Sequence, residues 1–409
     1  MKIKKLFVCF IILVYIFEII SFADEEIIEE NLDEIYYGET YETISSVSNE
    51  PLTHSKNIIA IDRKTLNVLY EKNAYDVVPM ASTTKIMTCI LAIEKCSLNE
   101  IVTISKNAAS INGSTLGITE NMQISISDLL YGLMLRSGND CAIAIAEHIS
   151  DSTQNFAELM NNKAEELGLN NTHFVTPHGL DNDNHYTTAY ELAILTDYAL
   201  KNETFKNIVS TKKYTIYLNG FSRELSNTNE LLGNLNGVYG VKTGFTFNAG
   251  RCLVSSTKRN DMDIIVVVLG ADTKNIRTKD SINVINYVFN NFSYINTYDI
   301  SQTAFEQYLK YFEKNCILYK TVDKPIIEIQ KKDNYEYPIK KDDMLKFSTK
   351  IYSITNFSSE INKGSKIGIL TLYNNDKILY SLDITIVNQL EQNTWYYYFK
   401  YMLKNFLIN

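Results

Sequence analysis

Two pairs of short apolar runs lie near the start and the end of the first 270 residues and have the composition of strands. Residues 58–61 and 67–70 flank a polar tetrapeptide, and residues 251–256 and 264–270, rich in β-branched side chains, flank residues 258–261. Polar stretches of this kind form turns. The pattern therefore predicts two β-hairpins.

Between these hairpins the apolar residues recur with the period of a helix. The pattern covers residues 82–95, 126–135 and 142–148, and a further run covers residues 279–292. Strands, a helical middle, more strands and a closing helix predict an α+β fold. We expect this first unit to cover residues 55–296.

The pattern changes after this unit. Residues 297–390 contain short alternating runs, such as 366–373 and 377–387, joined by polar turns such as 374–376. Alternation with a period of two is typical of half-buried strands. The sequence thus predicts a small β-rich C-terminal domain.

The last residues, 391–409, have the spacing of an amphipathic helix. Trp395, Phe399, Met402 and Phe406 share one face. Aromatic, partly basic helices of this kind bind the interfacial zone of a membrane. We expect peripheral contact with the outer face of the cytoplasmic membrane; the alternative is a terminal helix that packs on its own domain.

The N-terminus has the layout of an export signal. Lysines precede an apolar run from Leu6 to Phe17, and small residues end at Ala23. We expect residues 1–23 to be a cleaved signal peptide. The alternative is an uncleaved anchor, although Glu18 interrupts the run before it reaches spanning length. Both interpretations place the protein outside the cytoplasm.

Charge is concentrated behind this signal. Residues 24–50 carry ten Asp and Glu and no Lys or Arg, whereas the whole chain has a net charge of −9. We expect residues 24–54 to be an acidic, flexible segment. The remainder is nearly neutral and has no basic patch, which argues against nucleic acid as a partner.

The cysteines beyond the signal are widely spaced and form no CxxC pair, so the sequence predicts neither a disulfide framework nor a structural zinc site. His173, His178 and His185 fall close together, but their spacing lacks the carboxylate of a zinc peptidase. We expect ordered loop histidines, no metal and no cofactor.

Three Ser-x-x-Lys tetrads occur, and only one has a context suited to chemistry. Ser82 opens a helix-patterned apolar run, in which residues three apart share a face, so the Lys85 amine can approach its hydroxyl. The tetrad at Ser255 lies in a predicted strand, and the one at Ser210 opens no such run. A buried lysine can accept the serine proton, because burial disfavours its charged form. Taken alone, the pair is better explained as an N-cap serine and a surface lysine.

A second motif, Ser137-Gly138-Asn139, lies between two helix patterns. Its hydroxyl and amide could relay a proton and hold a substrate carbonyl. The Ser-x-Asn pattern recurs elsewhere in the chain, so the motif proves nothing by itself. Its position in a loop is the informative feature.

The third motif, Lys242-Thr243-Gly244, occurs once, just before the second hairpin. Lys242 offers a cation for a carboxylate, and Thr243 offers a hydroxyl donor. Gly244 has no side chain, so an extended substrate can pair with the backbone there. A solvated lysine at a turn is the alternative. The ordered set of three motifs is that of class A β-lactamases and penicillin-binding proteins.

With these motifs the chain resembles the low-molecular-mass penicillin-binding proteins, in particular the D-alanyl-D-alanine carboxypeptidases of peptidase family S11. The longer matches lie at residues 79–88, 136–140, 177–181 and 240–250. The resemblance is strong over residues 55–295. It implies an α+β catalytic domain of the β-lactamase and transpeptidase type, with an antiparallel sheet and helices.

The resemblance also implies a reaction. Ser82 would be acylated by a peptidoglycan stem peptide that ends in D-Ala-D-Ala, terminal D-alanine would leave, and water would release the acyl-enzyme. Lys85 would act as base, and Ser137 and Lys242 would assist proton transfer. β-Lactam antibiotics would inhibit the enzyme by acylating the same serine.

Substrate binding is assigned by the same resemblance. Backbone amides at positions 82 and 245 would form the oxyanion hole. A free terminal carboxylate needs a cation near Thr243, for which Arg277 is the candidate; the alternative is a surface arginine. The substrate-binding set expected from the sequence is Asn139, Lys242, Thr243, Gly244, Phe245 and Arg277.

Two rival functions share this fold. A class A β-lactamase would carry Ser-Asp-Asn, whereas this chain has Ser137-Gly138-Asn139 and an extra domain. A catalytically idle cell-wall binding module would have lost a motif side chain, and all are present.

Overall fold

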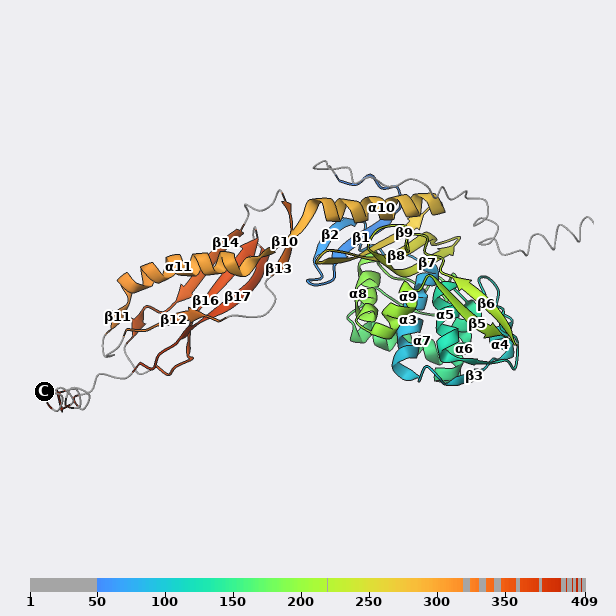
Figure 1. The fold of residues 1–409 in the computed structure, drawn as a ribbon, viewed down its shortest axis with the longest axis horizontal. Coiled ribbons are helices and arrows are strands. Elements are labelled where there is room, and N and C mark those ends of the chain that lie inside the picture. Colours follow the sequence, from blue (N-terminus) through green and yellow to red (C-terminus); the bar gives the residue numbers. More distant parts are fainter. Residues whose placement is uncertain are drawn as a thin grey trace, which may run out of the picture. The chain divides into compact units, whose positions relative to one another are not determined.

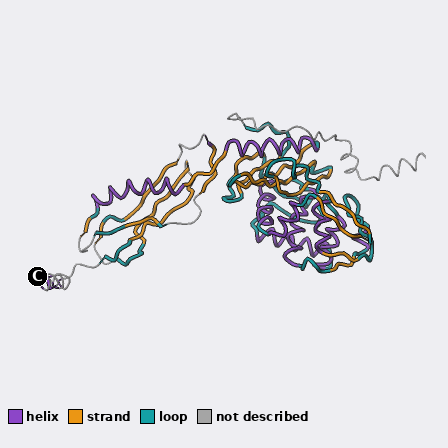
Figure 2. The backbone as a smooth tube through the Cα atoms, viewed as in Figure 1, coloured by secondary structure: helices purple, strands orange, loops and turns teal. Residues whose placement is uncertain are grey.

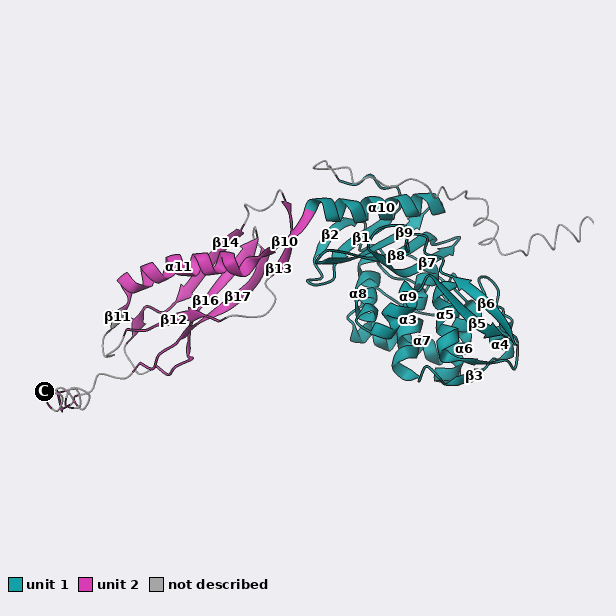
Figure 3. Cartoon of the chain, in the orientation of Figure 1, with its two compact units in different colours: residues 1–291 teal, residues 292–409 magenta. Residues whose placement is uncertain are grey.

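The computed structural model divides the chain into two compact units, Met1–Asn291 and Phe292–Asn409 (Figure 3). The predicted signal peptide and nearly all of the acidic segment lie outside the described residues. The described residues are 50–218, 220–318, 324–330, 336–341, 347–357, 361–374, 377–390, 395, 399, 402, 403 and 406.

A five-stranded antiparallel sheet organises the first unit (Figure 1). All six residues of β1 are buried, and residues 264–269 of β9 are fully inaccessible. Continuous apolar strands of this kind are covered on both faces. The order across the sheet is β2 (Val68–Lys72), β1 (Asn57–Asp62), β9 (Met262–Ala271), β8 (Gly250–Arg259) and β7 (Val238–Thr246). Both predicted hairpins are present.

Helix α10 (Lys274–Asn291) covers one face of this sheet, and a group of helices lies beneath the other (Figures 1 and 2). At the centre of that group is α3 (Lys85–Lys95), which contacts each of the larger helices around it. The others are α4 (Lys106–Ala109), α5 (Ile126–Leu135), α6 (Asn139–Ser150), α7 (Thr153–Glu166), α8 (Ala189–Leu200) and α9 (Glu203–Ser210).

Two small hairpins complete the first unit: β3 (Ile101–Thr103) with β4 (Gln123–Ser125), and β5 (Lys213–Leu218) with β6 (Phe221–Ser226). The predicted helix over residues 82–95 is in fact a 3₁₀ turn, η1 (Ala81–Thr84), that continues into α3. Helices α6 and α10 begin three and five residues earlier than the apolar pattern indicates, because their first turns are polar.

The second unit begins at β10 (Phe292–Asn296), five residues before the predicted boundary. This strand pairs with β13 (Glu336–Lys340). Its half-buried, aromatic pattern continues that of α10, so the apolar pattern alone shows no break there. The residues of the predicted turn at 375–376 lie outside those described.

Helix α11 (Thr297–Asn315) packs on the main sheet of this unit. Phe305 and Phe312 of the helix meet Leu370, Leu382 and Ile384 of the sheet in a separate apolar core. The sheet has the order β12 (Ile327–Ile329), β17 (Lys377–Ile386), β16 (Lys366–Asn374) and β14 (Phe347–Ser353), with β11 (Ile317–Leu318) and β15 (Asn356–Phe357) paired beside it.

Candidate active site

Ser82 lies in the 3₁₀ turn that leads into α3, at the junction with the sheet. Side chains three residues apart eclipse one another in a 3₁₀ helix. The Ser82 hydroxyl therefore lies over Lys85, the first residue of α3, and the Lys85 Nζ to Ser82 Oγ distance is 2.7 Å. Ser82 is 8% exposed and Lys85 is inaccessible.

Lys85 is held by groups from two other segments as well. Its Nζ donates to Asn139 Oδ1 at 2.8 Å and to the His178 carbonyl oxygen at 2.9 Å. Asn139 is the first residue of α6, so the starts of two packed helices meet at this amine. A buried ammonium group is costly unless such acceptors surround it.

Asn139 is itself fixed by a loop that precedes α5. Its side-chain Nδ2 donates to the Asn112 carbonyl at 2.9 Å, and its backbone N–H donates to the Ser114 carbonyl at 2.7 Å. Asp140 holds the same loop, because its carboxylate accepts the backbone N–H groups of residues 116, 117 and 118 at 2.8 to 3.2 Å. The sequence predicted neither the contact of Asn139 with this loop nor the role of Asp140 in holding it.

Ser137 lies between α5 and α6 with a backbone φ of 61°. This left-handed conformation is uncommon for a residue with a β-carbon and is often found at functional sites. The Ser137 hydroxyl is buried and has no hydrogen-bond partner among the described residues. Buried hydroxyl groups usually have a hydrogen-bond partner, and a role in proton relay would explain this exception.

The Lys-Thr-Gly segment lies on β7, the edge strand of the sheet. A β-carbon added at Gly244 would lie 3.0 Å from the Ser82 amide nitrogen, so only glycine lets the strand approach this closely. Thr243 Oγ1 is 2.7 Å from Thr228 Oγ1, and Lys242 is buried. An edge strand is the position in a sheet at which an extended peptide can pair.

Phe245 follows Gly244 and is covered by Arg251 from the neighbouring strand. The guanidinium carbon lies 3.8 Å from the centre of the phenyl ring, a cation–π contact. The two residues are partners in the β7–β8 register. This contact fixes the ring of the residue whose amide is expected in the oxyanion hole.

Arg277 lies on α10, is 3% exposed, and pairs with the carboxylate of Glu230. Burial raises the pKa of Glu230, but the positive charge of Arg277 and hydrogen bonds outweigh it, so the pKa is lowered overall. Glu230 follows Thr228, the partner of Thr243, by two residues. Sequence patterns gave no indication of Glu230, because a lone glutamate carries no motif.

His185 connects to the turn that carries the serine. Its Nδ1 accepts the Val175 N–H at 3.0 Å, and its Nε2 lies 2.7 Å from Thr84 Oγ1, which donates to the Ala81 carbonyl at 2.8 Å. The Thr84 hydroxyl proton is used in the bond to Ala81, so the hydrogen between Thr84 and His185 must belong to Nε2 of the histidine. Because Nδ1 accepts a hydrogen bond and carries no proton, the His185 ring is neutral. Ala81 has a φ of 49°, so this chain of bonds secures a strained residue next to Ser82.

Both buried histidines resist protonation. Burial, followed by the positive charge of Lys85 and a neighbouring histidine, lowers the pKa of His178 to about 3. Burial, followed by His173 and Lys85, lowers the pKa of His185 to about 4. His178 Nδ1 accepts the Leu180 N–H at 3.2 Å. Backbone groups thus occupy the Nδ1 atoms of both rings, as expected for structural histidines.

The structure brings Ser82, Lys85 and Asn139 into direct contact and places Gly244 against Ser82. A serine beside a buried lysine, bounded by Ser-x-Asn and Lys-Thr-Gly segments on an α+β fold, defines the penicillin-recognising class of serine acyl-transfer enzymes.

Comparison with known proteins narrows the class to a family. The family model for D-alanyl-D-alanine carboxypeptidases matches residues 44–273. The chain is 34% identical to D-alanyl-D-alanine carboxypeptidase DacF of Bacillus subtilis over 340 residues, which cover 81% of this chain and 85% of that protein. It is 32% identical to D-alanyl-D-alanine carboxypeptidase DacA of Haemophilus influenzae over 321 residues, 75% of this chain and 78% of that protein.

Among solved structures, penicillin binding protein 5 from Haemophilus influenzae matches with a TM-score of 0.67 and 27% identity, over 84% of this chain and 99% of that one. The chain belongs to the D-alanyl-D-alanine carboxypeptidase family and is a serine-type carboxypeptidase. The predicted resemblance and the predicted α+β fold with a β-rich C-terminal domain are confirmed.

Proposed function

We propose that Ser82 is the nucleophile of this carboxypeptidase and that Lys85 is its base. The observation that carries the proposal is the 2.7 Å contact between Lys85 Nζ and Ser82 Oγ inside a buried site. Once Lys85 has lost a proton to solvent, its neutral amine keeps two N–H donors for Asn139 and the His178 carbonyl and accepts the hydroxyl proton while Oγ attacks the carbonyl carbon of the penultimate D-alanine. The peptide C–N bond then breaks, and the leaving nitrogen takes up a proton.

Terminal D-alanine leaves in this step, and an ester joins Ser82 to the shortened peptide. Water then attacks the ester, gives its proton to the same base, and releases the peptide. Ser137 and Lys242 relay protons between the base and the leaving amine. The Ser137 hydroxyl, which has no hydrogen-bond partner in the described part of the chain, and the burial of Lys242 support these roles.

Substrate orientation is divided among the remaining residues. The amides of Ser82 and Phe245 stabilise the oxyanion, which the close approach of β7 at Gly244 supports. Asn139 holds the substrate amide. Arg277 binds the terminal carboxylate together with Thr243; because one of its nitrogens already binds Glu230, the carboxylate uses the others.

Release of D-alanine from a pentapeptide ending in D-Ala-D-Ala tests the activity, and fluorescent penicillin with intact-mass analysis tests the nucleophile. We expect one covalent label per chain, absent in Ser82→Ala and retained in Ser255→Ala, the matched decoy. Labelling of Ser82→Ala at the wild-type rate would refute the assignment. Rapid turnover of a chromogenic cephalosporin would favour a β-lactamase instead.

We also propose that the protein is exported by residues 1–23 and contacts the membrane through its C-terminal tail. Trp395, Phe399, Met402 and Phe406 are exposed, and the rings of Trp395 and Phe399 lie 5.6 Å apart. No helix in the described part of the chain is both long and apolar enough to span a bilayer. In a flotation assay with anionic vesicles, the mature chain should be recovered with the vesicles, and a variant truncated after residue 390 should not. Equal recovery of the two proteins with the vesicles would refute the proposal.

A further inference from the structure

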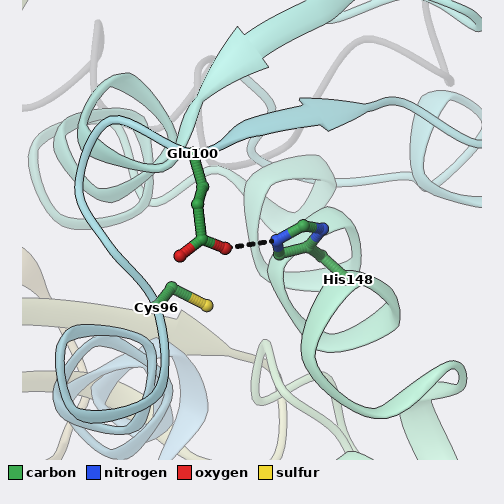
Figure 4. A group of neighbouring side chains, drawn as sticks. All are labelled: Cys96, Glu100 and His148. Carbon is green, nitrogen blue, oxygen red and sulfur yellow. Dashed lines mark hydrogen bonds and ion pairs between the residues drawn. The ribbon is translucent and has the colours of Figure 1, made fainter.

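Three side chains of different chemistry converge on the surface of the first unit, outside the active site. They are Cys96, just after α3; Glu100, just before β3; and His148, in the last turn of α6 (Figure 4). Figure 4 shows the carboxylate and the thiol directed toward the imidazole. A sulfur, a nitrogen and an oxygen ligand therefore point to one place.

The spacing of these atoms suits a single metal ion. One ligand atom from each residue lies within 4.8 Å of the other two, and Glu100 Oε2 is 3.1 Å from His148 Nε2. A tetrahedral zinc ion with bonds of about 2.0 to 2.3 Å holds its nitrogen and oxygen ligands about 3.4 Å apart, and sulfur about 3.6 Å from nitrogen. The carboxylate and imidazole are already close to that spacing, and the sulfur lies within 4.8 Å of both.

Glu100 is oriented for this role by its own backbone. Its second oxygen, Oε1, accepts the Ser97 N–H at 2.5 Å, which leaves Oε2 facing the imidazole. Hydrogen bonds that fix a ligand in this way are typical of metal sites.

We propose that Cys96, Glu100 and His148 bind one divalent ion of the zinc type, with a solvent molecule as fourth ligand. A thiolate, an imidazole and a carboxylate are a ligand set that zinc accepts and that magnesium and calcium do not. The Cys96 thiol loses its proton to solvent when the metal–sulfur bond forms. Cys96 and Glu100 share the loop between α3 and β3, whereas His148 is brought to them only by the packing of α6 against α3 and β3, so no sequence motif indicates this site.

The position of the ion gives it a structural role. Helices α3 and α6 begin with Lys85 and Asn139, which meet in the active site, and Cys96 and His148 lie at the opposite ends of the same helices. An ion at those ends ties the two helices together. Binding to the folded protein alone stabilises it by mass action.

The test uses the full mature chain without a histidine tag, stripped with a chelator and titrated with Zn²⁺ by calorimetry and with Co²⁺ by absorption. We expect one ion per chain and a near-ultraviolet sulfur-to-cobalt band. Cys96→Ser should abolish the band, and His148→Gln and Glu100→Gln should each weaken binding at least ~10-fold, the lower range for disturbing a metal site. Zn²⁺ should raise the melting temperature of the wild type but not of these variants.

Cys316→Ser, which changes another partly exposed free cysteine, is the matched control and should bind as the wild type does. Labelling by fluorescent penicillin confirms that each variant is folded, so a misfolded variant is recognised and replaced by Cys96→Ala. Absence of a one-to-one Zn²⁺ complex in the wild type, or a cobalt–sulfur band that survives in Cys96→Ser, would overturn the proposal.

Discussion

The buried His185 makes the catalytic unit sensitive to mild acid. In the folded protein its Nδ1 accepts a backbone N–H from Val175, so a proton added there would face another donor. Burial lowers the pKa of His185 to about 4, whereas the unfolded chain has a pKa of about 6.5. The unfolded state therefore binds more protons at pH 4 to 6.5, and the free energy of unfolding falls as the pH falls through this range.

The magnitude follows from the two pKa values. Between pH 6.5 and 4.5 the unfolded chain becomes almost fully protonated at this residue and the folded chain mostly does not. Linkage gives a loss of about 2 kcal/mol from His185 alone. A domain of ordinary stability has only about 5 to 15 kcal/mol to lose, so the effect is measurable.

His185→Gln removes the titration and keeps a donor that reaches Thr84. The only tryptophan, Trp395, lies in the second unit, so its fluorescence does not report on the first. Hydrogen exchange of peptides from β9, measured in a urea series at pH 6.5 and 4.5, reports on the first unit directly. The exposed His54→Gln serves as control.

We expect the wild type and His54→Gln to lose about 2 kcal/mol more than His185→Gln over this pH interval, since His178 contributes equally to all three. The reasoning fails if the wild type and His185→Gln differ by less than about 0.5 kcal/mol, the usual scatter of surface substitutions. That result would mean that the folded protein accommodates a charged His185.

Two further variants test how the site is held. Gly244→Ala places a methyl group 3.0 Å from the Ser82 amide nitrogen. We expect acylation by penicillin, measured by stopped-flow labelling, to slow about 10- to 100-fold with little change in melting temperature. An unchanged rate would show that β7 can move away from Ser82. Arg277→Gln leaves the Glu230 carboxylate buried and unpaired and should cost about 3 to 5 kcal/mol of unfolding free energy in urea. Adding Glu230→Gln should restore most of that stability but not the KM for the pentapeptide, and recovery of both would exclude Arg277 from substrate binding.

The sequence predicted the elements whose patterns are local. The hairpins β1–β2 and β8–β9 consist of apolar runs joined by polar turns, and both occur where expected. The polar first turns of α6 and α10 were missed, because helices begin with capping and charged residues that interrupt the apolar period. The second unit begins five residues before the expected boundary, because the aromatic residues of β10 continue the apolar pattern of α10.

The contacts of the site are less accessible to sequence reasoning than its motifs. Ser82 and Lys85 are three residues apart, so local geometry alone brings them together. Asp140 and Glu230, by contrast, act on segments more than 20 and more than 40 residues away, through contacts that only the folded chain creates. Single carboxylates of this kind carry no spacing signal.

The three motifs meet because each stands where a regular element begins or where the sheet ends. Lys85 and Asn139 open two packed helices, and Gly244 lies on β7, the edge strand of the sheet, against the turn that carries Ser82. Helix starts and sheet edges are the places at which backbone N–H groups remain free to bind a developing oxyanion. The strained Ala81, secured through Thr84 by His185, then directs Ser82 into this meeting point. Loss of the hydrogen bonds from His185 to Thr84 and from Thr84 to Ala81 should therefore reduce the acylation rate more than it reduces the binding of substrate.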